Sequence, residues 1–503
     1  MHSIPDKTHW EKLAAQVQFP TDLLIDGKWC AAQSGKRFPT INPATGATLA
    51  SIAEADTADI DLAVRSARTA FADGRWAGLP PRERGQRLIA LAKLIEEHRE
   101  ELALLETLNV GKPIRDSYRV DLPAVVRTFA WHGEAVDKVY DQIAPTEQGA
   151  IGMITREPLG VVAAVVPWNF PLEMAAWKIA PALAMGNSVI LKPAEQSPLT
   201  ALRLGELALE AGIPAGVLNI LPGYGPTAGK ALGLHADVDC IAFTGSTEVG
   251  KFFLQYAGQS NMKRVWLECG GKSPNIIFAD CPDLDAAAEA AAIAIFFNQG
   301  EVCSAGSRLL VENNIREDFI NRVIAAGKGL QPGDPLDPNT RIGAIVSDDQ
   351  LQRIMTYVKS ASQEGARLRL GGDRLRTETG GYYLAPTIFD NVTSTMTIAQ
   401  EEIFGPVLAV IGFDDETQAL EIANDSIYGL GAAVWTSNID RAHRLAKRLR
   451  AGTVWINSYE EGDATVPFGG FKQSGFGRDK SLHALEKYCD LKTTWIHLST
   501  DTV

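Results

Sequence analysis

The chain has 503 residues, of which 46% are hydrophobic and 22% are charged, and its formal net charge is −13. This length exceeds one ordinary core, so we expect two or three domains of about 100–200 residues each. The composition is that of a soluble globular protein, which excludes disordered and fibrous classes. The acidic balance without a dense basic cluster argues against nucleic acid as a partner.

The sequence also predicts no membrane span, leader or metal site. Uninterrupted apolar runs, such as 159–168, are shorter than the roughly 18 residues that predict a span, and residues 1–10 lack the apolar centre of a signal peptide. Six cysteines include no CxxC pair and eight histidines no HxxxH motif, so neither a disulfide framework nor a catalytic metal is expected. A cytoplasmic location is the simplest expectation.

The first part of the chain predicts two short strand pairs and three helices. The strand pairs surround turns at 26–27 and 43–46, where apolar residues flank turn-forming ones. One helix is expected from Asp56, with Asp56 or its neighbour as the cap. Two more are expected after 80–81 and across 121–140, because apolar residues recur there at helical spacing.

From residue 159 onward, apolar strands alternate with amphipathic helices. The first strand, 159–166, has no polar alternation, which is typical of a strand buried on both faces. Three strands (188–191, 217–221 and 240–243) and three helices (198–211, 227–234 and 247–257) follow in turn. This βαβ series predicts an α/β fold whose parallel sheet binds its ligand at the carboxyl ends of the strands.

Two glycine-rich stretches in this series match nucleotide-binding motifs only in part. Residues 223–229 miss the G-x-G-x-x-G spacing by one residue. Residues 245–251 match a phosphate loop, but Phe252 replaces the hydroxyl residue that holds magnesium, which excludes an ATPase or a kinase. The helix N-terminus near Ser246 would still suit a pyrophosphate without a metal. A plain tight turn is the alternative.

An acid follows another strand at the same edge of the predicted sheet. Glu195 ends the segment Lys192-Pro-Ala-Glu195. Its carboxylate could accept hydrogen bonds from ribose hydroxyls and would repel a 2′-phosphate, which favours NAD over NADP. The alternative is a loop acid that faces water.

A lone thiol lies between two apolar elements. A helical run ends at 297, the residues at 298–300 interrupt it, and a strand resumes at 309–311. Cys303 lies between them, and its small neighbours at 304–306 leave room for a substrate atom and for a backbone N–H. The alternative is an inert, buried cysteine.

Seven short blocks resemble, in their order, the aldehyde dehydrogenase superfamily over nearly the whole chain. They are PWNFP at 167–171, KPAE at 192–195, FTGST at 243–247, LECGGK at 267–272, GEVC at 300–303, EEIFGP at 401–406 and PFGG at 467–470. The family usually has leucine where this chain has Cys269. The likeness is strongest to the subgroup that oxidises aminoaldehydes, including γ-glutamyl-γ-aminobutyraldehyde and guanidinobutyraldehyde, through residues 461–467 and 477–487.

The resemblance implies an α/β fold in three parts. A Rossmann-like NAD-binding domain would comprise 1–141 and 158–270, and a second α/β catalytic domain would comprise 271–480. A small β oligomerisation arm would combine 142–157 with 481–503. Since that arm would otherwise expose a strand edge, a homodimer or homotetramer is expected.

The resemblance also implies roles in oxidising an aldehyde to a carboxylic acid. Cys303 would attack the carbonyl carbon, and Asn169 with the Cys303 backbone N–H would stabilise the thiohemiacetal oxyanion. Glu268 would activate the water that releases the thioester. Lys178 matches a position involved in proton relay or in shifting the pKa of site groups. The plain alternatives are a turn residue, a strand-end acid and a solvated lysine.

The resemblance implies two further sets of contacts. The residues expected to contact NAD are Trp168, Lys192, Glu195, Gly225, Gly245, Ser246, Glu402 and Phe404. Those expected to line the substrate tunnel are Phe170, Glu173, Trp177, Phe297, Glu461, Asp463 and Phe468. Carboxylates among the latter, with Glu460, would attract an ammonium or guanidinium group, so an aldehyde from polyamine or arginine breakdown is expected.

Two other functions would fit parts of the same pattern. If the loop acids only face water, they do not select a cationic substrate, and the chain would be a broad dehydrogenase of aliphatic or hydroxy-aldehydes. A non-catalytic relative would keep the fold alone, and intact Cys303, Glu268 and Asn169 argue against it.

Overall fold

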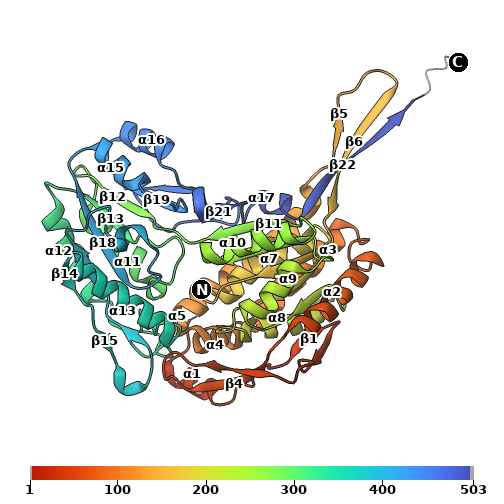
Figure 1. The fold of residues 1–503 in the computed structure, drawn as a ribbon, viewed down its shortest axis with the longest axis horizontal. Coiled ribbons are helices and arrows are strands. Elements are labelled where there is room, and N and C mark those ends of the chain that lie inside the picture. Colours follow the sequence, from red (N-terminus) through yellow and green to blue (C-terminus); the bar gives the residue numbers. More distant parts are fainter. Residues whose placement is uncertain (1–2, 499–503) are drawn as a thin grey trace.

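A computed structural model describes residues 3–498 and contains two large β-sheets, one in each half of the molecule (Figure 1). The first sheet has eight strands in the order β2-β1-β9-β8-β7-β10-β11-β21. They are β1 (Leu23–Ile25), β2 (Lys28–Cys30), β7 (Val161–Val165), β8 (Ser188–Lys192), β9 (Leu218–Ile220), β10 (Cys240–Gly245), β11 (Arg264–Cys269) and β21 (Gly475–Phe476).

The parallel core of this sheet confirms the predicted βαβ series. Strands β7 to β11 pair in parallel, and β7 lies between β8 and β10. The strand order therefore reverses between β7 and β10, which in α/β folds opens a crevice for a ligand at the carboxyl ends. Val165 pairs with Phe243 and Thr244 pairs with Glu268, so the ends of β7, β10 and β11 meet at this edge.

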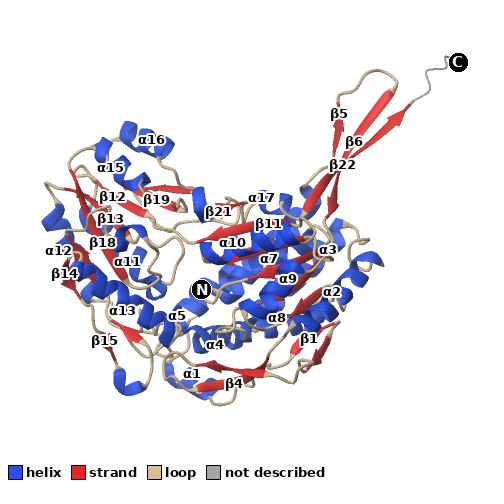
Figure 2. Ribbon diagram, viewed as in Figure 1, coloured by secondary structure: helices blue, strands red, loops and turns tan. Residues whose placement is uncertain are grey.

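Helices cover both faces of the first sheet (Figure 2). They are α1 (Lys7–Ala14), α2 (Thr57–Ala72), α3 (Pro81–Glu97), α4 (Arg99–Val110), α5 (Ile114–Asp116), α6 (Leu122–Ala135), α7 (Pro171–Ala184), α8 (Leu199–Glu210), α9 (Lys230–Leu234) and α10 (Thr247–Gln259). Asp56 caps α2 as predicted, because its carboxylate accepts a hydrogen bond from the Ala58 N–H at 2.9 Å. The helix expected at 227–234 begins slightly earlier, as a π-helical segment (Gly225–Gly229) that continues directly into α9.

The second sheet has seven strands in the order β14-β17-β18-β13-β12-β19-β20. They are β12 (Pro274–Ile277), β13 (Arg308–Glu312), β14 (Arg367–Leu370), β17 (Thr387–Asp390), β18 (Val407–Phe413), β19 (Gly431–Trp435) and β20 (Thr453–Ile456). The helices of this half are α11 (Leu284–Phe296), α12 (Arg316–Lys328), α13 (Asp348–Gln363), α14 (Thr397–Gln400), α15 (Glu416–Asn424) and α16 (Ile439–Arg448). One hydrophobic cluster contains Trp177 of α7 and Phe296 of α11, so both halves share a core.

The chain returns to the first half before it ends. After β20, strand β21 pairs with β11, and the short helix α17 (His483–Glu486) contacts α7. Two small two-stranded sheets complete the fold: β3 (Arg37–Ile41) with β4 (Thr48–Ala53), and β15 (Arg374–Leu375) with β16 (Tyr383–Leu384). The predicted domain limits stay a prediction.

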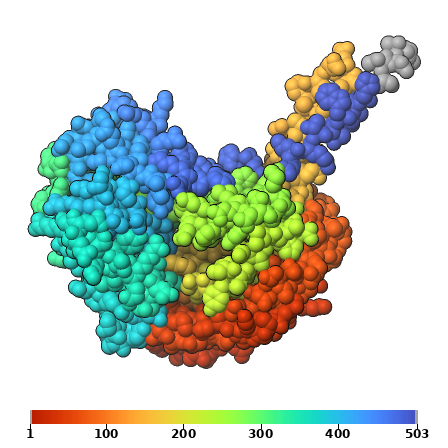
Figure 3. Space-filling model, in the orientation of Figure 1, coloured from red at the N-terminus to blue at the C-terminus, as the bar shows by residue number. Residues whose placement is uncertain are grey.

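A three-stranded antiparallel sheet projects from the body (Figures 1 and 3). It joins β5 (Gln142–Ala144), β6 (Ala150–Pro158) and β22 (Cys489–His497), with β22 paired to β6 along its whole length. Large apolar side chains are exposed on it, including Ile143 and Leu491. Apart from Pro158 at the end of β6, these strands lie in the segments 142–157 and 481–503 that were predicted to form the oligomerisation arm, and residues 499–503 lie outside the described residues.

Between residues 3 and 498, the structure contains no helix with the length and apolarity needed to cross a membrane. In the same range, no cluster of three or more His, Cys, Asp or Glu side chains is arranged to hold a metal ion.

Candidate active site

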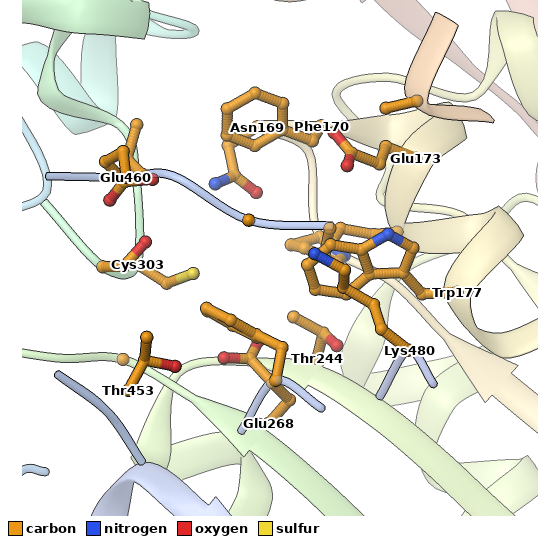
Figure 4. Close-up of a pocket in the computed structure, with 18 of the residues that line it drawn as sticks. Asn169, Phe170, Glu173, Trp177, Thr244, Glu268, Cys303, Thr453, Glu460 and Lys480 are labelled. Carbon is orange, nitrogen blue, oxygen red and sulfur yellow. The ribbon is translucent and has the colours of Figure 1, made fainter. Parts of the chain in front are cut away.

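A cavity of about 1000 Å³ lies between the two halves and is lined by both (Figure 4). Its wall is formed by the loop after β7, the ends of β10 and β11, the segment after α11 and the segment after β20. The predicted site residues that line it are Trp168, Asn169, Phe170, Glu173, Trp177, Gly245, Ser246, Glu268, Phe297, Cys303, Glu402, Phe404, Glu461, Asp463 and Phe468. The predicted residues outside it are Lys178, Lys192, Glu195 and Gly225.

The segment before Cys303 has an unusual backbone. Asn298, Gln299 and Gly300 have φ values of 46°, 58° and 72°, which place three consecutive residues in the left-handed region. Glycine is required at 300, because a Cβ there would lie 2.3 Å from the carbonyl of Gly405. Since non-glycine residues adopt this conformation only where surrounding contacts impose it, the position of the thiol depends on its neighbours.

Side-chain hydrogen bonds fix this segment from both halves. The Gln299 Oε1 accepts from the Gly343 N–H at 2.8 Å, and the Glu301 Oε1 accepts from the Val346 N–H at 3.0 Å. From the first half, the Asn169 Nδ2 donates to the Glu301 carbonyl at 2.8 Å. Asn169 therefore joins the loop after β7 to the segment that precedes the thiol.

Glu268 is a buried carboxylate at the end of β11. It is 4% exposed, and neither of its oxygens accepts a hydrogen bond from the described residues. Burial raises the pKa of Glu268 to about 8; the Lys178 cation opposes the shift and the Asp479 and Glu402 carboxylates add to it. In Figure 4, Glu268 and Cys303 face the same open space. At neutral pH this acid is mostly protonated and becomes a base as the pH rises through 8.

The Cys303 thiol is protonated in the same environment. Burial raises its pKa well above the ordinary value, and the Glu268, Glu460 and Glu402 carboxylates add to the shift. A thiol must lose its proton before it attacks a carbonyl. Formation of the reactive Cys303 thiolate therefore needs a base that accepts the proton, or a change in the charges around the thiol that lowers its pKa.

Lys178 lies beside the cavity in a buried ion cluster. Its Nζ contacts one carboxylate oxygen of Asp479, and the Lys487 Nζ contacts the other. All three side chains are at most 5% exposed. Burial opposes the charged form of Asp479, yet the two lysines outweigh it and lower the pKa of Asp479. The cluster thus places fixed charges behind Glu268, and the predicted role of Lys178 stays a prediction.

The edge formed by β10 and β11 has the features of a nucleotide site. Ser246 caps α10 by accepting from the Val249 N–H at 3.3 Å, and its neighbour Gly245 also faces the cavity. Free N–H groups and the helix dipole favour a pyrophosphate at such a helix start. Across the cavity, the Trp168 and Phe404 rings meet edge to face with centroids 5.1 Å apart.

Glu402 approaches this edge from the second half. Its Oε1 accepts from the Gly271 N–H at 3.0 Å, and burial raises the pKa of Glu402 to about 7. A Cβ at residue 270 would lie only 2.0 Å from the Glu402 Oε2, so glycine there lets the carboxylate reach the cavity. These residues fit a bound dinucleotide: a helix start for phosphates, an acid for a ribose and aromatic rings for a planar base.

Aromatic rings and carboxylates form the opposite part of the cavity. The Phe170 ring stacks on Phe297 with centroids 6.3 Å apart, and Trp177 meets Phe468 at 5.3 Å. Burial raises the pKa of Glu173 in this wall to about 7. Such walls suit an extended aliphatic chain with a polar end.

Comparison with known proteins identifies the family. The family model described as "Aldehyde dehydrogenase family" matches residues 29–494. The chain belongs to the aldehyde dehydrogenase family. The predicted family, the α/β aldehyde dehydrogenase fold and the enzyme class are confirmed.

Three relatives show how similar this aldehyde dehydrogenase is to known ones. The NADP/NAD-dependent aldehyde dehydrogenase PuuC of Escherichia coli (strain K12) is 52% identical over 490 residues, covering 97% of this chain and 98% of that protein. The structure of an indole-3-acetaldehyde dehydrogenase with NAD+ is 57% identical with a TM-score of 0.98, over 98% of this chain and 100% of that one. A γ-glutamyl-γ-aminobutyraldehyde dehydrogenase of Burkholderia cenocepacia is 56% identical with a TM-score of 0.97, over the same shares.

The predicted cofactor residues of this aldehyde dehydrogenase that lie outside the cavity form two groups. The Lys192 Nζ donates to the Pro193 carbonyl at 2.8 Å and lies 3.8 Å from the Glu195 carboxylate, just past β8. Gly225 begins the π-helical segment at 225–229, and a Cβ at this residue would meet open space. Their contacts with NAD stay a prediction.

The structure also adds lining residues that the sequence did not predict. Arg119, Arg127 and Lys480 bring cations to a cavity in which the charged residues predicted to line the substrate tunnel were all acids, and Thr244 and Thr453 add hydroxyls. Lys480 lies within the block 477–487 that carries the likeness to aminoaldehyde oxidisers. That block was the one feature of the sequence that could have pointed to Lys480. It contains several polar residues, and nothing in the sequence indicated which of them lies in the cavity.

Proposed function

We propose that this chain oxidises an aldehyde, preferably an aminoaldehyde of polyamine or arginine breakdown, to the carboxylic acid with NAD. The observation that supports this most is the cavity in which Cys303, Glu268 and Asn169 from both halves meet. Relatives named for NAD and for γ-glutamyl-γ-aminobutyraldehyde share more than half of their residues with it. When bound, NAD supplies the acceptor for the hydride of the aldehyde carbon.

In the first step, the Cys303 thiol gives its proton to an ionised carboxylate of the cavity, and Glu268 faces the same open space. The sulfur bonds to the carbonyl carbon, and the carbonyl π electrons move to the oxygen. The Asn169 amide has two N–H donors. One of them is held by the Glu301 carbonyl, which orients the other for the oxyanion. Loss of one such donor typically costs about 10²–10³ in rate.

In the second step, water releases the acid. After the carbon has lost its hydride, it is a thioester of Cys303. The Glu268 carboxylate accepts a proton from water, the water oxygen bonds to the thioester carbon, and the carbon–sulfur bond breaks. Gly270 and Gly271 directly follow the strand end that holds Glu268, and so permit the carboxylate to move.

The pH dependence of turnover tests Glu268. Below its pKa of about 8 the acid is protonated and cannot serve as a base, so hydrolysis should rise about tenfold per pH unit up to that value and then level off. Glu268→Gln should lower kcat by about 10²-fold or more and remove this rise. Steady-state rates from pH 6 to 9, with pre-steady-state release of reduced cofactor, measure both. A rise of the thioester hydrolysis rate that persists in Glu268→Gln would show that another group is the base, since the thioester has no free Cys303 thiol to lose a proton.

The acids of the cavity support an aminoaldehyde as substrate. Glu460 and Glu461 line it with Asp463, and a cationic far end of the substrate would lie among them. The aromatic walls support the second candidate, a broad dehydrogenase of aliphatic or hydroxy-aldehydes, since they would hold an uncharged chain equally well.

A comparison of two aldehydes decides between these candidates. An ω-amino or guanidino aldehyde should have a kcat/KM about tenfold above that of the alkanal of equal length. Asp463→Ala should reduce this ratio, whereas Asp440→Ala, at an exposed residue of α16, should leave it unchanged. Rates are followed by absorbance of the reduced cofactor. Equal values for the two aldehydes, or no effect of Asp463→Ala, would favour the broad dehydrogenase.

We also propose that the chain forms a homodimer or homotetramer in the cytoplasm. The exposed apolar side chains of the projecting sheet, including Trp495 of β22, support burial against another copy. The six cysteines are all free, which suits a reducing compartment.

A further inference from the structure

Lys480 is a cation at the wall of the cavity, half-buried and across the open space from Cys303 in Figure 4. Its Nζ lies over the Trp177 ring, 5.6 Å from the centroid. Among residues 3–498, no carboxylate oxygen lies within 4.0 Å of this nitrogen. The ammonium group is therefore available to a ligand.

Lys480 lies in a segment with a strained backbone that hydrogen bonds hold in place. Lys480 and Ser481 have φ values of 60° and 53°, a left-handed pair without glycine, and such a conformation persists only where surrounding contacts impose it. The Ser481 N–H donates to the Ala464 carbonyl at 2.8 Å, and Asp479 exchanges two backbone hydrogen bonds with Phe468. The segment of Lys480 is thus fastened to the cavity loop that contains Asp463.

Charges of both signs surround this lysine. Burial lowers the pKa of Lys480, while the Glu173, Asp463 and Glu460 carboxylates oppose that shift and Arg127 adds to it. A second cation entering this part of the cavity would have to share those carboxylates with Lys480. An anionic group beside it would gain a charged hydrogen bond from the lysine.

We propose that Lys480 determines specificity by binding a carboxylate at the far end of the substrate. The carboxylates around it then hold an ammonium group next to that carboxylate. The substrate class that fits best is an aldehyde whose far end is an α-amino acid group, with both charges, in preference to one that ends in a bare ammonium. This inference rests on the proposed oxidation at Cys303.

Four aldehydes of matched length, ending in a carboxylate, a methyl group, an ammonium group or an α-amino acid group, test the proposal. Lys480→Met should lower kcat/KM about tenfold to hundredfold for the two that carry a carboxylate, the size expected for a lost charged hydrogen bond. It should leave the methyl-ended aldehyde unchanged and raise kcat/KM for the ammonium-ended one. Lys480→Arg should retain the preference for a carboxylate, and Lys93→Met, at an exposed residue of α3, should change nothing.

Equal losses on all four aldehydes would overturn the proposal, since Lys480 would then only support the fold. A carboxylate that gives no advantage over a methyl group in the unaltered enzyme would overturn it as well. The ratio of ammonium-ended to methyl-ended aldehyde separately tests the aminoaldehyde preference, so either idea can fail without the other. Absence of turnover with every aldehyde would instead contradict the proposed oxidation at Cys303.

Discussion

Cys303→Ala should lower kcat/KM for every aldehyde by about 10⁴-fold or more, because the variant lacks the nucleophile that forms the covalent intermediate. The Cys303 thiol faces the open space shared with Glu268 and Asn169. The other cysteine of the cavity lining, Cys269, is only 2% exposed, and its Sγ packs toward Gly250 of α10. Its removal deletes a small side chain from a cavity wall, so the fold should persist. Reduced-cofactor absorbance measures the loss, and an unchanged thermal unfolding temperature shows that the fold is intact.

A second cysteine variant is the control for this prediction. Cys281 lies outside the cavity, partly exposed after β12, and its thiol donates only to the Asp283 carbonyl at 3.4 Å. Cys281→Ala should keep full activity. In addition, iodoacetamide should label Cys303 and abolish turnover, and an aldehyde should slow both. Turnover that survives Cys303→Ala would rule out the covalent mechanism.

Asp479→Ala should destabilise the protein by about 3–5 kcal/mol, the cost typical of removing one partner from a buried ion pair. Both lysines that contact Asp479 would remain buried without a counter-charge. The Asp490–Arg264 pair is the matched control, because its side chains are 56% and 40% exposed and Asp490→Ala should cost at most about 1 kcal/mol. Thermal unfolding of the variants side by side measures the difference. Equal decreases in the unfolding temperature of the two variants would contradict the proposed contribution of the buried ion cluster to stability.

A triple variant separates the effect of this cluster on stability from its effect on the pKa of Glu268. Lys178→Met and Lys487→Met added to Asp479→Ala should recover most of the stability, since apolar groups often replace buried ion clusters without loss. The pKa of Glu268 should rise above 8, because the two cations that lower it are removed with only one anion that raises it. The pH profile of hydrolysis should therefore move to higher pH even where stability returns.

The elements that could be predicted from the sequence are those with a local cause. The apolar runs of β7 and β8 and the Asp56 cap of α2 follow from residues next to one another. Helix α7 gave no amphipathic period, because almost every one of its residues is buried. The helix predicted at 227–234 likewise begins earlier, with a π-helical segment at 225–229 that the spacing of apolar residues did not predict.

The same distinction applies to the site. The order of short blocks brought Cys303, Glu268 and Asn169 into one hypothesis, and the fold places all three around one cavity. Lys178 was expected to be solvated if it had no function, yet it is buried against Asp479, which is 301 positions away in the chain. The sequence likewise did not predict Lys480 as a cavity residue. A pairing between residues so far apart depends on how the two halves assemble, and no local pattern contains it.

The left-handed run at Asn298–Gly300 limits how this enzyme can be divided. The second half fixes the run through the amides of Gly343 and Val346, and the first half fixes it through Asn169. A fragment that ends between the two sheets would lose one side of this brace, and the run would relax to ordinary backbone angles. The reactive sulfur therefore acquires its place only in the intact polypeptide, so a separately produced catalytic half should have no dehydrogenase activity.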